Sequence, residues 1–141
     1  MLILNQALKV SIKIIKPEVK MSDNFVKIAR KEIQDELAGL ENILANCAND
    51  VDISDNAQNL EKHLHKIKGL APMMGQQGMG DIARMIDIII KHVITDGTLE
   101  GTYKIITEAN LMMKQIFDGS AIKNIQEFRN KVQQSFPPLF D

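Results

Sequence analysis

Residues 57–74, AQNLEKHLHKIKGLAPMM, decide the fold class of this chain. Apolar residues recur along the stretch at spacings of three and four, which is the period of a helix that buries one face. They are Ala57, Leu60, Leu64, Ile67, Ala71 and Met74. The stretch therefore predicts an amphipathic helix whose apolar side must be covered by other helices.

The same period appears on both sides of this stretch. We expect helices at about 24–47, 80–94 and 98–117, and another that starts near Ile122 and ends before Pro137. With eight glycines, four prolines and no proline between Pro17 and Pro72, the composition also favours long helices. The chain is therefore predicted to be all-α.

Short polar breaks separate these helices. Ser54 or Asp55 is expected to cap the helix over 57–74, and TDG at 95–97 to stop the next one. The glycines at 75, 78 and 80 are expected to supply turn conformations. Connections this short favour an antiparallel up-down-up-down four-helix bundle, with the additional C-terminal helix packed outside it.

A length of 141 residues suits a single domain. We expect a helical bundle over residues 21–136, a C-terminal tail over 137–141 and an N-terminal extension over 1–20. The extension fits a strand period and a helix period equally well. A fresh start at MSDNF, where Ser22 or Asp23 can cap a helix, separates it from the bundle.

The net charge, the hydropathy and the single cysteine limit the classes of protein to which this chain can belong. The net charge of −1 gives no support for nucleic-acid binding. No apolar run is long enough for membrane insertion, so a cytoplasmic location is expected. Cys47 is the only cysteine, which excludes an internal disulfide, and its place on an apolar stripe predicts a buried thiol.

His65 is the main candidate functional residue. It follows the core residue Leu64 by one position, which rotates it about 100° away from the core, so we expect it at the edge of the bundle. Beyond it, Gly69 and Pro72 both weaken a helix, by about 1 and 3 kcal/mol. Together with Lys62 they are expected to form a bare docking surface for a partner protein, beside a cation at Lys68 that can neutralise a phosphoryl group.

The stretch HKIKGLAPMMG, residues 65–75, resembles the His-x-x-Lys-Gly signature of histidine-containing phosphotransfer domains, including the usual glycine ten residues after the histidine. The subgroup it is most similar to is the N-terminal phosphotransfer domain of chemotaxis-type histidine kinases. The resemblance covers about Met21 to Val132. Asp87 stands where that subgroup has glutamate, and Arg84 where some members carry a second histidine.

The resemblance implies that His65 accepts a phosphoryl group, that Lys68 neutralises its charge, and that Asp87 accepts a hydrogen bond from the imidazole Nδ1–H. It implies a histidine kinase catalytic domain and a response-regulator receiver domain as partners, with Mg and ATP on those partners and no cofactor, metal or small-molecule substrate on this chain. The absence of a Gly-rich nucleotide loop agrees with a phosphoryl carrier rather than a complete enzyme. Whether the chain is a piece of a longer kinase stays open.

Two alternatives remain at this stage. One is a helical adaptor that binds a receiver or kinase domain without accepting phosphate. The other is an enzyme or metal protein built on the histidines. His63 and His65 point to nearly opposite sides of a helix, which argues against a shared metal, and we expect His63 and His92 to be surface histidines. Met73, Met74 and Met79 are expected to serve in packing.

Overall fold

The computed structural model describes residues 23–120 and 125–140 of the chain. The predicted N-terminal extension, residues 1–20, lies outside these ranges. The chain divides into two compact units, residues 1–30 and residues 31–141. Of the first unit, only the helical residues 23–30 are described, so the account below concerns the second unit.

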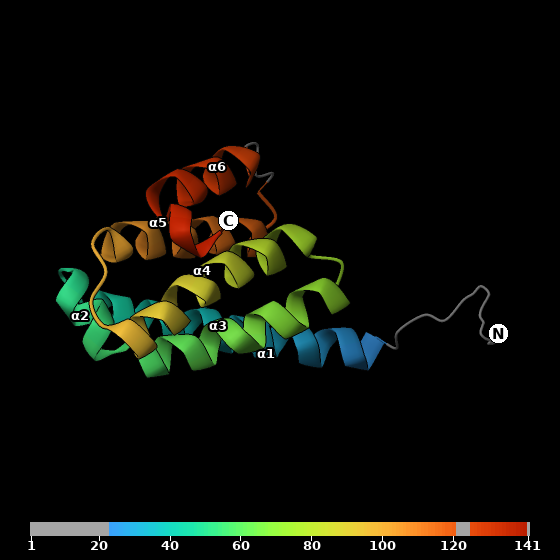
Figure 1. Ribbon diagram of the computed structural model, residues 1–141. Helices are drawn as coiled ribbons and strands as arrows, with labels where there is room; N and C mark the ends of the chain where they lie inside the picture. Colours follow the sequence, from blue (N-terminus) through green and yellow to red (C-terminus); the bar gives the residue numbers. More distant parts are fainter. Residues whose placement is uncertain (1–22, 121–124, 141) are drawn as a thin grey trace. The chain divides into compact units, whose positions relative to one another are not determined.

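The described residues form six α-helices and one short 3-10 helix, with no strand among them, which confirms the all-α prediction (Figure 1). The elements are α1 (Asp23–Ala45), α2 (Asp50–Asp55), α3 (Ala57–Met73), α4 (Gln77–Asp96), α5 (Thr102–Phe117), α6 (Ile125–Ser135) and η1 (Pro137–Leu139).

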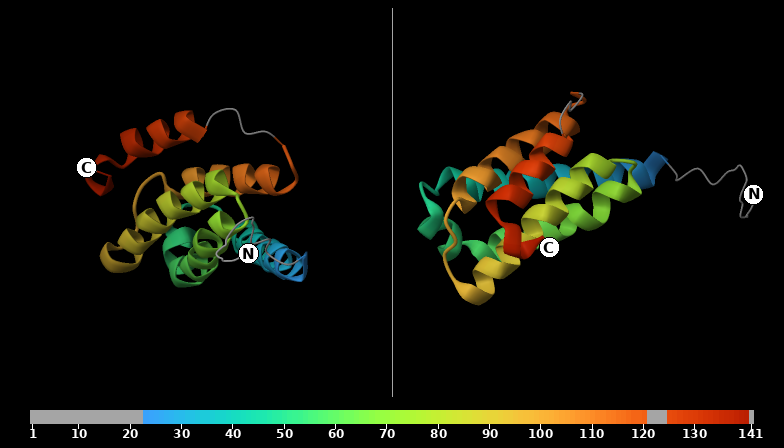
Figure 2. Two further views of the ribbon diagram at one scale, coloured as in Figure 1. Left: turned by 90° about the vertical axis from the view of Figure 1, so that its right-hand side faces the viewer. Right: turned by 45° about the horizontal axis from the view of Figure 1, so that its top comes forward.

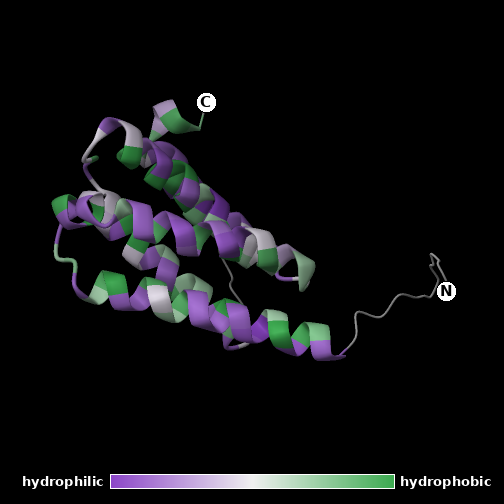
Figure 3. Cartoon of the chain, turned by 90° about the horizontal axis from the view of Figure 1, so that it is seen from below, coloured by the Kyte–Doolittle hydropathy of each residue, from purple (hydrophilic) through white to green (hydrophobic). Residues whose placement is uncertain are grey.

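Helix α4 is central in the second unit because it packs against α3, α5 and α6 (Figures 1 and 2). Its contact with α3 is the most extensive between any two elements. The helices are amphipathic, with apolar and polar residues alternating along each ribbon (Figure 3). The predicted stripe of α3 is buried from Ala57 to Ala71, whereas Met74 caps the helix and is half-buried. Most apolar residues of α4 are buried as well, namely Met79, Ile82, Ala83, Met85, Ile86, Ile89, Ile90 and Val93.

Helix α2 was not predicted, and the expected cap at Ser54 or Asp55 is wrong because both residues lie inside it. The helix begins after Asn49, whose side chain accepts a hydrogen bond from the backbone N–H of Asp52 at 3.0 Å. A side-chain oxygen at this position satisfies one of the free N–H groups of a first turn. Asn56 then separates α2 from α3 and makes no side-chain cap to it.

The glycines between α3 and α4 do not all act in the turn. Gly75 has φ of 76°, a left-handed conformation that glycine adopts without strain, so its predicted turn role is confirmed. Gly78 and Gly80 instead lie within α4, which corrects the prediction for both. A Cβ on Gly80 would lie 2.8 Å from Cγ of Pro72, so this glycine makes room for the proline ring at the end of α3.

Helix α5 begins at Thr102, four residues later than predicted, and Asp50 of α2 accounts for this start. The Asp50 carboxylate accepts hydrogen bonds from the backbone N–H groups of Gly101 at 2.9 Å and Tyr103 at 2.8 Å. The Thr102 hydroxyl donates at 3.3 Å. Burial raises the pKa of Asp50, but these hydrogen bonds outweigh it and the pKa falls below its ordinary value.

The prediction of a buried thiol at Cys47 is confirmed. Burial, followed by the charges of Asp52 and Asp55, raises the pKa of this cysteine and keeps the thiol protonated. The thiol donates to the carbonyl of Ile43 at 3.3 Å.

Two of the three methionines near the turn serve in packing as expected. Met79 is fully buried and Met74 packs against the core. Met73 is 50% exposed, so the packing prediction is wrong for this residue. It lies at the end of α3.

The predicted tail contains the 3-10 helix η1, and Leu139 and Phe140 pack against the core. Within the described residues, no helix has the length and apolar character that a membrane span needs.

Candidate functional site

Helices α3 and α4 bring His65 and two of its predicted companions together. His65 lies in the middle of α3, next to the buried Leu64, and its side chain is 63% exposed. The predicted exposure of His65 is confirmed. Lys68 lies one turn further along α3, and Asp87 faces it from α4.

Asp87 is a buried carboxylate held by two lysines. Its side chain is 2% exposed, and its Oδ2 accepts hydrogen bonds from Nζ of Lys68 at 2.9 Å and pairs with Nζ of Lys91 at 3.0 Å. Burial raises the pKa of Asp87, but the hydrogen bonds from the two lysines outweigh it and the pKa lies below its ordinary value. Asp87 is therefore ionised at neutral pH.

The other oxygen of Asp87, Oδ1, is buried and lacks a hydrogen-bond partner among the described residues. A buried acceptor without a partner is uncommon, because desolvation of the oxygen is then uncompensated. His65 and Asp87 each bring one ligand atom within 4.8 Å of the other, which places the imidazole near this carboxylate but beyond hydrogen-bond distance.

No hydrogen bond joins His65 to Asp87 in the described part of the chain, so the orientation of His65 by Asp87 stays a prediction. The carboxylate paired with the imidazole is that of Glu61, whose Oε2 lies 3.8 Å from Nδ1 of His65. Glu61 precedes His65 by four residues, which places the two on the same face of α3.

Glu61 and Lys91 are the members of the cluster that the sequence interpretation did not assign. In the sequence, Glu61 precedes His65 by four residues, and Lys91 follows Asp87 by four residues. Residues at this spacing lie side by side on one face of a helix. Such pairs are frequent on helix surfaces, so the spacing alone did not distinguish them. The fold distinguishes them because Asp87 is buried and faces α3.

The surface beyond His65 is as bare as the sequence predicted. A Cβ added to Gly69 would meet nothing within 4 Å, and the same holds for Gly75. Lys62 is exposed, and so is Met73, one turn beyond Gly69. Pro72 is half-buried and its ring contacts Gly80 of α4, so it has a packing role whatever it does in docking.

His63 is not the surface histidine that we expected. Its Nδ1 lies 2.6 Å from Oε1 of the buried Glu36 in α1, and its ring packs over Gly39, where a Cβ would come within 2.4 Å of the imidazole. Two residues along a helix amount to a rotation of about 200°, which turns His63 toward α1 and away from His65. Lys66 also approaches Glu36, with Nζ 3.5 Å from Oε2.

His92 is about one third exposed and pairs with Asp96 on the same helix, with 3.0 Å between Nδ1 and Oδ2. Neither it nor His63 contributes to the cluster around His65.

The cluster also contains a possible set of metal ligands. Glu61, His65 and Asp87 each offer one ligand atom, and these atoms lie within 4.8 Å of one another. The two lysines on Asp87 balance the two carboxylates, so the net charge disfavours a divalent cation there.

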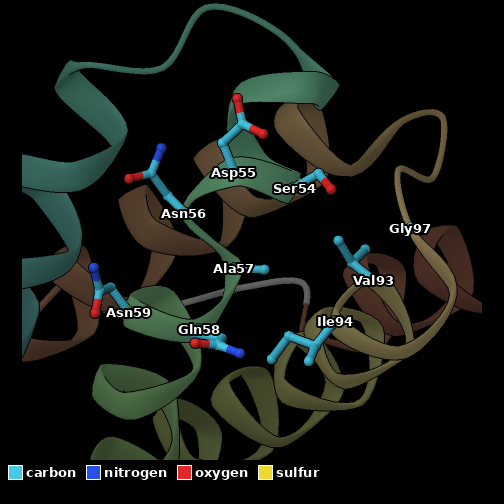
Figure 4. Close-up of a pocket in the computed structure, with 9 residues that line it drawn as sticks. All are labelled: Ser54, Asp55, Asn56, Ala57, Gln58, Asn59, Val93, Ile94 and Gly97. Carbon is cyan, nitrogen blue, oxygen red and sulfur yellow. The ribbon is translucent and has the colours of Figure 1, made fainter.

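A pocket of about 330 Å³ lies away from this cluster, between residues 54–59 at the α2–α3 junction and Val93, Ile94 and Gly97 near the end of α4 (Figure 4). Its only charged lining residue is Asp55. Its lining includes the hydroxyl of Ser54 but no histidine to activate it, and a single carboxylate is too few for a set of metal ligands, so the pocket is a weaker candidate than the cluster around His65.

The site combines an exposed imidazole, a neighbouring carboxylate, two lysines on a buried aspartate and an open surface beyond. Comparisons of the chain with protein-family models, with curated proteins and with solved structures give no match.

Proposed function

We propose that this chain is a histidine phosphotransfer module of a two-component signalling relay, of the chemotaxis type, which accepts a phosphoryl group on His65 and passes it to a receiver-domain aspartate. The observation that supports this most is the exposed His65 beside Lys68, with open space around Gly69. The resemblance of residues 65–75 to the phosphotransfer signature points to the same function.

The proposal includes a bundle topology. Helices α1, α3, α4 and α5 would run up and down alternately as an antiparallel four-helix bundle, with α6 as the additional C-terminal helix. The short connections, such as residues 74–76 between α3 and α4, support this arrangement. A rigid bundle would hold His65 in place while a partner's active site closes over it.

The chemistry requires little from this chain beyond a positioned nucleophile. Nε2 of His65 attacks the phosphorus of the donor, a nucleotide γ-phosphate or an acyl phosphate, and a P–N bond forms as the P–O bond breaks. The electron pair of the broken bond stays on the donor oxygen. The Nδ1 proton stays on the ring, and the carboxylates of Glu61 and Asp87 favour the positive charge that develops there.

Transfer to the receiver reverses this step. The aspartate oxygen of the receiver attacks the phosphorus, the P–N bond breaks and its electron pair returns to Nε2. ATP and Mg belong to the partner domains in this scheme, and cytoplasmic placement follows from the kinase and receiver partners. A partner would dock on the bare surface of Lys62, Gly69 and Pro72, where the exposed Met73 adds apolar area.

Labelling with a kinase tests the proposal. The chain is incubated with the catalytic domain of a chemotaxis-type kinase, Mg and radiolabelled ATP, together with the variants His65→Gln, His63→Gln and His92→Gln. We expect an acid-labile, alkali-stable label on the wild type and on the His63 and His92 variants, and none on the His65 variant.

Equal labelling of the His65→Gln variant would contradict the assignment of the acceptor. Failure of every kinase and every phosphorylated receiver in a panel to label the folded wild-type chain would contradict the relay itself.

Two observations favour the second candidate, a helical adaptor that binds a receiver or kinase domain and is never phosphorylated. The Nζ of Lys68 is already engaged by Asp87 at 2.9 Å, and no carboxylate lies within hydrogen-bond distance of the His65 ring among the described residues. The adaptor predicts partner binding that survives His65→Ala in a chain that takes up no label.

A further inference from the structure

Two lysines share a single oxygen of Asp87. Lys68 and Lys91 lie 2.9 and 3.0 Å from Oδ2, and they come from different helices, α3 and α4. The side chain of Asp87 is 2% exposed, whereas those of Lys68 and Lys91 are 29% and 54% exposed. The carboxylate is thus fixed inside the molecule, while both cations reach the surface.

The second lysine on Asp87 affects how easily Lys68 can leave this carboxylate and bind a phosphoryl group. A lysine that neutralises a phosphoryl group on His65 must leave the carboxylate that it now binds. Departure of the only counter-ion would leave a buried, unpaired carboxylate, which is strongly unfavourable. With Lys91 still at 3.0 Å, Asp87 keeps one cation and the departure of Lys68 becomes easier.

We propose that Lys91 is a positioning residue that holds the charge of Asp87 while Lys68 moves to the phosphoryl group on His65. The inference rests on the proposed function, because it explains how Lys68 becomes available to the phosphoryl group. It also goes beyond that function by giving a role to a residue outside the His-x-x-Lys-Gly signature. Lys91 acts through Asp87 and Lys68 and does not need to contact phosphate.

The pairing of Lys91 supports this role. Lys91 lies one helical turn after Asp87, so the helix itself holds the two side chains within reach of each other. Its hydrogen bond to Asp87, followed by the charge of that carboxylate, raises the pKa of Lys91, which keeps it cationic over a wide pH range. Removal of a surface lysine that does not contact Asp87 would leave the pairing and the pKa of this carboxylate unchanged.

The first experiment compares the labelling rate of Lys91→Met with that of a matched control. Lys66→Met is a suitable control because Lys66 adjoins His65 and is 55% exposed, close to the 54% of Lys91, but pairs with Glu36. We expect Lys91→Met to slow labelling of His65 about tenfold and Lys66→Met to change it less than about twofold. Equal rates for the two variants would overturn the inference.

The second experiment does not require phosphorylation. NMR titration of the Asp87 carboxyl group is carried out in Lys68→Met, which imitates the departure of Lys68, and in the Lys68→Met/Lys91→Met double variant. We expect the pKa of Asp87 to stay below its ordinary value in the single variant and to rise well above that value in the double variant. A pKa that rises as far in Lys68→Met as in the double variant would overturn the role of Lys91.

The two experiments separate failure of the function from failure of the inference. If the folded wild-type chain takes up no label from any donor, the relay proposal fails, while the titration still decides whether Lys91 holds Asp87.

Discussion

At the scale of single residues, the glycine after Lys68 distinguishes a docking role from a packing role. Gly69 lies inside α3, where glycine is about 1 kcal/mol less favourable than alanine, and an added Cβ would meet nothing within 4 Å. Packing therefore does not require the glycine. Gly80 is the opposite case, because a Cβ there would lie 2.8 Å from the ring of Pro72.

Substitutions at these two glycines should separate stability from transfer. Gly69→Leu should leave the free energy of unfolding unchanged or raise it by up to about 1 kcal/mol, because helix propensity improves and no contact is strained. It should also block phosphotransfer by filling the docking surface. Gly80→Ala is the control, and it should cost about 1–3 kcal/mol through overpacking against Pro72 while leaving the space around Gly69 unfilled.

Thermal denaturation and transfer to a receiver domain measure the two effects. Normal transfer by a folded Gly69→Leu protein would remove the docking explanation of this glycine.

At the scale of elements, periodicity predicted the long helices but not their ends. Helix α2 was missed because its six residues, DVDISD, are too few to show a helical period. Gly78 and Gly80 looked like turn residues, yet α4 includes both because they allow close packing at the start of the helix. Turn residues and packing residues cannot be distinguished without the neighbouring element.

In the candidate site too, some features could be predicted from the sequence and others could not. His65 and its exposure followed from its position relative to Leu64, since both residues share one helix. The carboxylate that pairs with His63 could not be predicted, because Glu36 lies 27 residues earlier in the chain and meets it only through packing of α1 with α3. Local geometry can be predicted from sequence, whereas pairs between helices depend on the register of their packing.

The Asp50 cap of α5 gives a prediction at the element scale. Asp50→Ala should lower the free energy of unfolding by about 1 kcal/mol at neutral pH, because the backbone N–H groups of Gly101 and Tyr103 lose their acceptor. Asp55→Ala, an exposed position on the same helix, is the control and should change stability by less than about 0.5 kcal/mol. Urea denaturation of the three proteins measures the difference.

The contribution of Asp50 should also depend on pH. Its pKa in the folded chain lies below the unfolded value of about 3.9, so the stabilisation is present in full above that value and is lost as the pH falls through the folded pKa. The stability difference between wild type and Asp50→Ala should therefore shrink on acidification. A difference that stays constant from pH 7 to pH 2.5 would contradict the capping role.

At the scale of the whole molecule, the described helices present the exposed imidazole of His65, the acceptor in our proposal, on a helical framework. The core of α3 and α4 fixes the backbone on both sides of the site, Asp87 provides a buried charge, and His65 and the lysines lie at the surface. A molecule of this kind suits a carrier, because partners must reach the phosphoryl group from outside. The kinase and the receiver would supply the metal ion and the remaining catalytic groups.

The most direct test of this account is to locate the phosphoryl group in the intact chain. Phosphorus-coupled ¹⁵N NMR of the kinase-treated protein identifies both the histidine and the ring nitrogen that is modified. The account predicts a single phosphoryl group on Nε2 of His65, which disappears when a receiver domain and Mg are added. A phosphoryl group on His63 or His92, or a folded chain that stays unmodified with every donor, would contradict it.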